Sequence, residues 1–249
     1  MVRRSTPTYR NKSEQIAEAL LARIIADGMK PGDVLGTEAD LVAEHDVSRP
    51  TLRESLRMLE AQGVVSLRPG PGGGVTVGKP SVESLAHALS VFLYLQGVPF
   101  QTVLKAREVI EPALAFEAAK GGTDAEFDEM QASIERMRGF LSEAGFIAEN
   151  RSFHRIIARA SRNAVLESFW EAISLLAAGE QQPISYTSRN RVHVLKAHEE
   201  ILVALRDRDP ATAAARMAAH VGELEHLVQR RSSANPGRTS AAAIGYGPA

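Results

Sequence analysis

The sequence predicts a mainly α-helical protein in which a small N-terminal domain with two strands precedes a larger bundle of helices. Three observations support this fold class. Residues 37–77 show two helix patterns joined by a tight turn, followed by two strand patterns around a tip rich in Pro and Gly. After Lys79, helical patterns with cap residues recur without strand patterns. Apolar residues make up 44% of the 249 residues but aromatic residues only 5%, which favours packing of helix on helix.

The N-terminal part of the chain contains clear helix starts. A first helix is expected from Ser13, as its N-cap, to Gly28. Thr37 and an acid three residues later have the spacing of a capping box, so a second, short helix begins there. Ser48 then caps a third helix, and Pro50 lies in its first turn, where a missing N–H costs nothing. Two helices around such a tight turn form a helix-turn-helix.

The third helix presents two different faces. Its leucines share one face and its arginines recur at every fourth position on another, namely Leu52, Leu56 and Leu59, and Arg49, Arg53 and Arg57. Such a helix can bury its leucines and lie in the major groove of DNA with its guanidinium groups directed at guanine edges and phosphates. For three arginines considered alone, an ordinary solvated basic face is the alternative.

The segment after this helix favours DNA binding. Val64–Arg68 and Gly74–Val77 predict two strands, and the segment 69–73 between them cannot be helical. Its glycines leave backbone N–H groups free to approach phosphates closely. The combination predicts a winged helix-turn-helix domain over residues 1–79. The predicted DNA-binding residues are Ser48, Arg49, Pro50, Thr51, Arg53, Arg57, Arg68, Gly70 and Gly72.

A run of positions through this domain carries a family resemblance. It comprises Ile25, Gly28, Pro31, Gly32, Leu35, Thr37, Glu38, Leu41, Val47, Ser48, Arg49, Thr51, Leu52, Arg53, Glu54, Leu56, Leu59, Gly63, Val64, Gly70 and Val75. In these positions the chain resembles the DNA-binding domain of GntR-type transcription regulators. The resemblance implies that Arg49 and Arg53 contact bases and that wing residues near Gly70 enter the minor groove. It places Ser48, Pro50 and Thr51 at the groove. Pro50 replaces a common hydroxyl residue, and Ala39 replaces a base-contacting Arg of some members, which affects the operator sequence.

The rest of the chain predicts an all-helical domain over residues 80–231. About seven helices are expected from the pattern of apolar residues and caps, at 81–95, 100–120, 124–141, 147–161, 164–176, 191–206 and 210–230. Pro112 is expected to interrupt the second of these. The Ser/Ala/Gly/Pro-rich tail at 232–249 has too little to bury and is expected to be disordered.

Two histidines lie symmetrically about a predicted turn. His198 lies 11 residues before Asp209 and His220 lies 11 residues after it. If the two helices are antiparallel, both imidazoles lie at the same level, ~16 Å from the turn at a rise of 1.5 Å per residue. Asn150 and His154 lie one turn apart on another helix. Three imidazoles and an oxygen in a bundle core suit a divalent metal such as Zn, Ni, Mn or Fe. The alternative is ordinary polar histidines, with Asn150 as a helix cap.

The surroundings of these positions carry a second resemblance, within residues 85–228. The matching pieces are Asn150-x-x-Phe153-His154, Ala197-His198-Glu199-Glu200-Ile201, Asp209-Pro210 and Met217-x-x-His220. They resemble the FCD effector domain of the FadR subfamily of GntR regulators. The resemblance implies a divalent metal (Zn, Ni or Mn) bound by Asn150, His154, His198 and His220, with Asn150 in place of the usual Asp. Four neutral ligands favour capture of an anion, so our hypothesis is that the effector's own carboxylate binds the metal.

Arg107 is the predicted contact for that effector. It is in register with Val103, Ile110 and Leu114 on the apolar stripe of its helix, and a buried guanidinium needs a partner. In related effector domains, an Arg at this place reaches ligand carboxylates. The alternative is an ion pair with Glu111, one turn later on the same helix.

These features predict a ligand-responsive transcription regulator, and the resemblance implies a repressor, since repression relieved by the ligand is the commoner arrangement in the family. We expect it to bind a near-palindromic double-stranded DNA operator as a homodimer, and a small organic acid in the helical domain to change its DNA affinity. One alternative is the same class of regulator sensing a fatty acid or acyl-CoA without metal. A more distant alternative is a metal-dependent enzyme built on the three histidines. Since no H-E-x-x-H spacing surrounds them, no enzymatic activity is expected.

Composition and charge exclude further kinds of protein and of metal site. The net charge of −1 predicts modest affinity of a single copy for DNA, so a specific site is expected to need two copies. The absence of cysteine excludes disulfide scaffolds and thiolate metal sites. No secretory signal is visible, and the apolar run at residues 85–98 is too short to cross a bilayer. A soluble, cytoplasmic protein without a membrane partner is expected.

Overall fold

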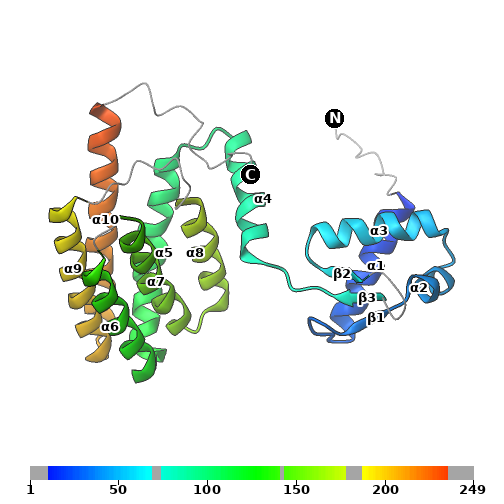
Figure 1. The fold of residues 1–249 in the computed structure, drawn as a ribbon, viewed down its shortest axis with the longest axis horizontal. Helices are drawn as coiled ribbons and strands as arrows, with labels where there is room; N and C mark the ends of the chain where they lie inside the picture. The colour runs from blue at the N-terminus through cyan, green and yellow to red at the C-terminus, as the bar shows by residue number, and fades with distance from the viewer. Residues whose placement is uncertain (1–10, 69–73, 141–142, 178–186, 235–249) are drawn as a thin grey trace, which may run out of the picture. The chain divides into compact units, whose positions relative to one another are not determined.

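The computed structural model of the chain describes residues 11–68, 74–140, 143–177 and 187–234. The chain divides into two compact units, Met1–Ser84 and Leu85–Ala249. In Figure 1 the first unit carries the three short strands, and the second is built of long helices. The domain boundary expected after Lys79 lies shortly before α4 (Val82–Leu95), and the division between the units falls inside that helix.

The N-terminal unit combines three helices with an antiparallel sheet. Its elements are α1 (Lys12–Ala26), β1 (Val34–Gly36), α2 (Glu38–His45), α3 (Arg49–Ala61), β2 (Val65–Arg68) and β3 (Gly74–Val77). The strand order is β1-β3-β2, and β2 pairs with β3 from Val65↔Val77 to Arg68↔Gly74. The predicted strands are β2 and β3. β1 was not predicted, because three residues are too few to show an alternating pattern.

Side-chain caps begin α2 and α3 as the sequence predicts. The hydroxyl of Thr37 accepts a hydrogen bond from the backbone N–H of Asp40, and the Asp40 carboxylate accepts one from the backbone N–H of Thr37. The hydroxyl of Ser48 accepts a hydrogen bond from the N–H of Thr51, and Pro50 lies in the first turn of α3. These two caps determine where the two helices of the helix-turn-helix begin.

The start of α1 differs from the prediction by two residues. The N-cap is Asn11, whose side chain accepts a hydrogen bond from the N–H of Ser13. Ser13 lies inside the helix, where its hydroxyl donates to Glu54 of α3 at 2.7 Å. Asn11 and Ser13 are both suitable N-cap residues, and only the packing of α1 on α3 brings Glu54 to the Ser13 hydroxyl.

The core of this unit orients α3. Leu52, Leu56 and Leu59 are at most 2% exposed and pack in one cluster with residues of α1, α2 and the sheet. Burying each leucine contributes roughly 1.5–3 kcal/mol, which is enough to determine which face of the helix turns inward. The face that carries the arginines is consequently the outer one.

The second unit consists of seven helices within the described residues, as predicted. After α4 they are α5 (Phe100–Gly121), α6 (Asp124–Gly139), α7 (Glu143–Ala160), α8 (Ala164–Ala177), α9 (Ser188–Arg206) and α10 (Pro210–Ala234). Thr123 and Glu126 form a capping box at the start of α6, and Asp209 accepts a hydrogen bond from the N–H of Thr212 at the start of α10. The largest core cluster joins α5, α6, α7, α9 and α10.

Three predictions about these helices were wrong. Pro112 does not interrupt α5, which continues over 22 residues because α10, α7 and α8 pack along it. α7 begins at Glu143, earlier than expected, so Asn150 lies inside the helix and is not its cap. α10 continues to Ala234, past the predicted start of the tail at residue 232. Residues 235–249 lie outside the described residues. In the part of the chain that is described, no helix is long and apolar enough to cross a membrane.

Candidate DNA-binding helix and histidine site

The outer face of α3 carries the predicted DNA-binding residues together. Ser48, Arg49, Pro50, Arg53 and Arg57 are exposed and Thr51 is partly exposed. These residues share one face because α3 begins at Ser48 and buries its leucines on the opposite face. Arg68, at the end of β2, is also exposed. The predicted wing residues Gly70 and Gly72 lie outside the described residues.

Arg53 is held by an acid from the preceding helix. Its Nε donates to Oε2 of Glu38, on the first turn of α2, at 2.9 Å. This contact uses Nε, so the two terminal nitrogens remain available for a bidentate contact with a guanine edge. Among the described residues, no carboxylate pairs with Arg49 or Arg57. The three guanidinium groups therefore differ, and Arg53 is the one whose orientation is set before DNA arrives.

The three predicted histidines meet inside the second unit. Nε2 of His220 lies 3.1 Å from Nε2 of His154 and 3.1 Å from Nε2 of His198. All three rings lie close enough to offer one nitrogen each to a common centre, within 4.8 Å of one another. His154 and His198 are buried. The prediction that antiparallel helices would bring His198 and His220 level is thus confirmed by α9 and α10.

These distances fit a metal better than hydrogen bonds between rings. Nε2 of His220 faces two other Nε2 atoms, and a single N–H can be donated to only one of them. Metal–nitrogen bonds of about 2.0–2.1 Å place neighbouring ligand nitrogens roughly 3.0–3.4 Å apart. The two distances from His220 therefore suit rings that share one cation.

Asn150 has the property expected of a fourth ligand. It lies one turn before His154 on α7, is 9% exposed, and its Oδ1 is buried without a hydrogen-bond partner in the described part of the chain. A buried carbonyl oxygen without a partner costs roughly 1–3 kcal/mol. An oxygen-binding cation at the cluster would remove this cost.

Burial keeps the histidines in the form that binds metals. It lowers the pKa of His198 well below its ordinary value, and neighbouring His220 and His154 add to the effect. Burial and then His154 lower the pKa of His220 to about 3. Both rings are therefore neutral at pH 7 and have a lone pair to give.

Arg107 and Glu111 lie beside this cluster, on α5. Nε of Arg107 is 2.5 Å from Oε1 of Glu111, and Nδ1 of His154 is 2.6 Å from Oε2 of the same carboxylate. Burial alone would raise the pKa of Glu111, but Arg107 and His154 together hold it well below its usual range. The ion pair considered from sequence as the alternative for Arg107 is therefore formed, in the core.

Sequence reasoning missed the role of Glu111. Glu111 was expected only as a partner for Arg107. A carboxylate on the apolar stripe of a helix, however, needs more than one buried partner. The contact with His154 joins residues 43 positions apart, and only the packing of α5 against α7 brings them together. The register of Glu111 with the core positions of α5 is the sequence signal that could have indicated its burial.

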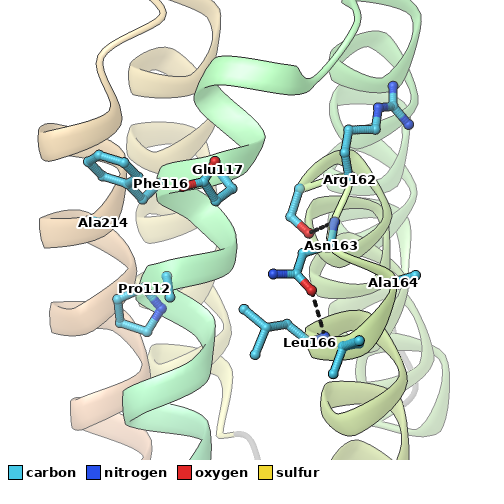
Figure 2. Close-up of a pocket in the computed structure, with 11 residues that line it drawn as sticks. Pro112, Phe116, Glu117, Arg162, Asn163, Ala164, Leu166 and Ala214 are labelled. Carbon is cyan, nitrogen blue, oxygen red and sulfur yellow. Dashed lines mark hydrogen bonds between the residues drawn. The ribbon is translucent and has the colours of Figure 1, made fainter.

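A groove runs along the other side of α5. It has a volume of about 790 Å³ and lies between α5 and α10 on one side and the turn from α7 to α8 on the other (Figure 2). Pro112 and Phe116 of α5 line one wall, with Phe116 on the side of Ala214 of α10, and Leu166 of α8 lines the other wall. None of the three histidines lines this groove, so it is separate from the histidine cluster.

Two regions of the chain match known families. Residues 12–76 match the family described as bacterial regulatory proteins, gntR family, and residues 102–223 match the FCD domain. The Exu regulon transcriptional regulator of Escherichia coli K12 is 30% identical over 226 residues, which cover 88% of this chain and 85% of that protein. The transcriptional repressor NanR of Citrobacter rodentium is 28% identical over 230 residues, with coverage of 89% and 87%.

A solved structure agrees with the fold. Streptococcus agalactiae GntR has a TM-score of 0.64 with 22% sequence identity, over 86% of this chain and 99% of that one. The matching families and these relatives are transcription regulators, which excludes the alternative of a metal-dependent enzyme. The chain therefore belongs to the GntR family of transcription regulators, with a DNA-binding domain followed by an FCD domain.

Proposed function

We propose that this protein is a homodimeric repressor of the FadR subfamily, which binds a near-palindromic operator and responds to a small carboxylate held by a divalent metal. The observation that carries the sensing part is the convergence of three Nε2 atoms, together with the partnerless Oδ1 of Asn150 one helical turn before His154. As a DNA-binding regulator it would act in the cytoplasm. The name of the relative NanR, a repressor, supports the proposed sign of regulation.

The charge of the site supports an acidic effector. Zn²⁺, Ni²⁺ or Mn²⁺ bound by Asn150 and three neutral histidines would keep its full positive charge. The carboxylate of Glu111 is already occupied by Arg107 and His154. An anionic ligand would therefore be attracted to the metal, and Arg107, on the adjacent helix, is the proposed second contact for its carboxylate.

A panel of small carboxylates with and without metal tests this function. We expect one class of small organic or sugar acids to raise the melting temperature only when Zn²⁺, Ni²⁺ or Mn²⁺ is present, and the same acids to change the affinity for an operator selected from random duplexes. Stabilisation by fatty acids or acyl-CoA that persists in a chelator would instead support the metal-free alternative.

The proposed dimer uses the outer face of α5 and α8. Val109 and Phe116 of α5 and Val165 and Phe169 of α8 are 74%, 39%, 65% and 48% exposed. Phe116 and Val165 both line the groove between these helices, so we propose that the two helices form one apolar surface. Two copies related by a two-fold axis could cover this surface, and the second copy would supply the DNA-binding domain for the second half-site.

Val165→Glu is expected to convert the dimer to a monomer. An uncompensated charge buried in an interface costs about 3–5 kcal/mol, so the dimer dissociation constant should rise by about 100-fold or more. Light scattering after size exclusion measures the state, and operator affinity should fall with it. Val203→Glu is the matched control, since Val203 lies on α9 and is 58% exposed. If Val165→Glu stays dimeric, the interface lies elsewhere.

A further inference from the structure

The carboxylate of Glu111 joins two functional side chains through its two oxygens. Oε1 lies 2.5 Å from Nε of Arg107, and Oε2 lies 2.6 Å from Nδ1 of His154. Glu111 is 1% exposed, so no bulk water competes for either oxygen. The contact with Arg107 is a charge-assisted hydrogen bond, and the contact with His154 is a close approach of the carboxylate to the ring nitrogen.

The geometry on His154 determines which ring nitrogen faces the cluster. A neutral imidazole carries one proton, and an ionised carboxylate can only accept. With Glu111 at Nδ1, the proton is held on that nitrogen, and Nε2 is left with a lone pair. That Nε2 is the atom that lies 3.1 Å from Nε2 of His220.

His198 shows the contrast. Within the described ranges no carboxylate pairs with His198, and its ring is held by stacking on Phe153, with ring centroids 4.0 Å apart. Stacking fixes the plane of a ring but does not choose its tautomer. The carboxylate beside Nδ1 is therefore a specific feature of His154 and not a general property of the cluster.

We propose that Glu111 is a positioning residue that presents Nε2 of His154 to the metal and, through its other oxygen, links this ligand to Arg107. This inference rests on the proposed metal-assisted function. Carboxylates that accept from the second nitrogen of a metal-bound histidine orient the ring and make it a stronger ligand, and their loss lowers metal affinity about 10–100-fold. The same carboxylate ties the predicted anion contact to the metal site.

The contact between Glu111 and Arg107 predicts how binding of the acid changes the metal affinity. An anion that draws Arg107 away leaves Glu111 with more negative charge for the N–H of His154. A stronger acceptor makes the ring more electron-rich, so metal affinity should rise when the acid binds. By linkage, the metal should raise the affinity for the acid by the same factor.

Zn²⁺ affinity, measured by competition with a chelator, tests the proposal in the full-length protein. Glu111→Gln should bind Zn²⁺ about 10–100-fold more weakly than the wild type, because an amide oxygen accepts less strongly and the amide N–H₂ opposes a donor. Glu117→Gln is the matched control, since Glu117 lies on α5, pairs with Lys120 and is exposed to solvent. The control should keep wild-type affinity.

A second measurement needs no variant. Nitrogen chemical shifts of the His154 ring in wild-type protein should show the proton on Nδ1 both before and after Zn²⁺ is added. A proton on Nε2 before Zn²⁺ is added would overturn the proposal, as would wild-type Zn²⁺ affinity in Glu111→Gln. If the wild-type protein itself does not bind Zn²⁺, Ni²⁺ or Mn²⁺, the metal-assisted function fails and the inference fails with it. Normal metal binding with an unaffected Glu111→Gln overturns the inference alone.

Discussion

Replacing His198 with alanine is expected to remove stoichiometric metal from protein purified without a chelator or a His-tag. The ring is fully buried, and its Nε2 lies 3.1 Å from that of His220. Loss of a direct ligand should lower metal affinity by at least the roughly 100-fold upper value for loss of a residue that only supports a ligand. Metal content by elemental analysis gives the first result.

Thermal unfolding provides a second measurement on His198→Ala. A metal present at 100 times its dissociation constant stabilises the folded state by about 2.7 kcal/mol, which corresponds to roughly 5–10 °C for a domain of this size. His198→Ala should lose this metal-dependent shift. The comparison is made between metal-loaded and chelator-treated samples of the same variant, because the alanine also removes the ring that stacks on Phe153.

Two further variants complete this test. His220→Ala should also lose the shift, and it creates a smaller cavity because His220 is partly exposed. His193→Ala should behave like the wild type: His193 lies on α9 with His198, but its side chain is 59% exposed and pairs with Glu223. Metal binding that survives both cluster variants would contradict the proposed site.

Arg53→Ala is expected to abolish the preference for an operator while leaving the fold intact. The side chain is 61% exposed and outside the core, so the free energy of unfolding should change little. A bidentate contact between Arg and guanine contributes about 1–3 kcal/mol of discrimination. With two half-sites, affinity for the selected operator should fall roughly 30-fold or more, and affinity for random duplex much less.

Lys30→Ala serves as the control for charge. Lys30 is exposed in the turn between α1 and β1 and lies outside α3, and its loss removes the same single charge. It should weaken both specific and random duplex slightly and equally. Binding is measured at fixed salt by fluorescence anisotropy, after the operator has been selected with wild-type protein. If Arg53→Ala and Lys30→Ala have the same effect, Arg53 does not read bases.

The recognition helix illustrates how far local signals reach. Ser48, Pro50 and the spacing of the leucines predicted the start of α3, its buried face and its outer arginines, because caps and helical periodicity depend on neighbours within a few residues. The same signals did not predict that Nε of Arg53 is bound by Glu38 of α2, since that contact depends on how the two helices cross.

The histidine cluster shows what helical spacing can predict and what it cannot. The equal spacing of His198 and His220 about Asp209 was sufficient to predict that they lie level, because an antiparallel helix pair converts sequence distance into height. That argument does not determine which ring nitrogens converge, or which carboxylate supports them. The ion pair from Glu111 to His154 spans two helices that are not adjacent in sequence.

The sequence by itself therefore determined the two-domain organisation, the winged DNA-binding domain, the outer arginines and the identity of the three histidines. Only the tertiary structure decided that α5 continues through Pro112, that Arg107 is held by Glu111, and that Oδ1 of Asn150 is buried without a hydrogen-bond partner in the described chain. The physical reason is range. Caps and periodicity act over one or two helical turns, whereas burial and buried polar pairing depend on segments brought together by the packing of the whole bundle.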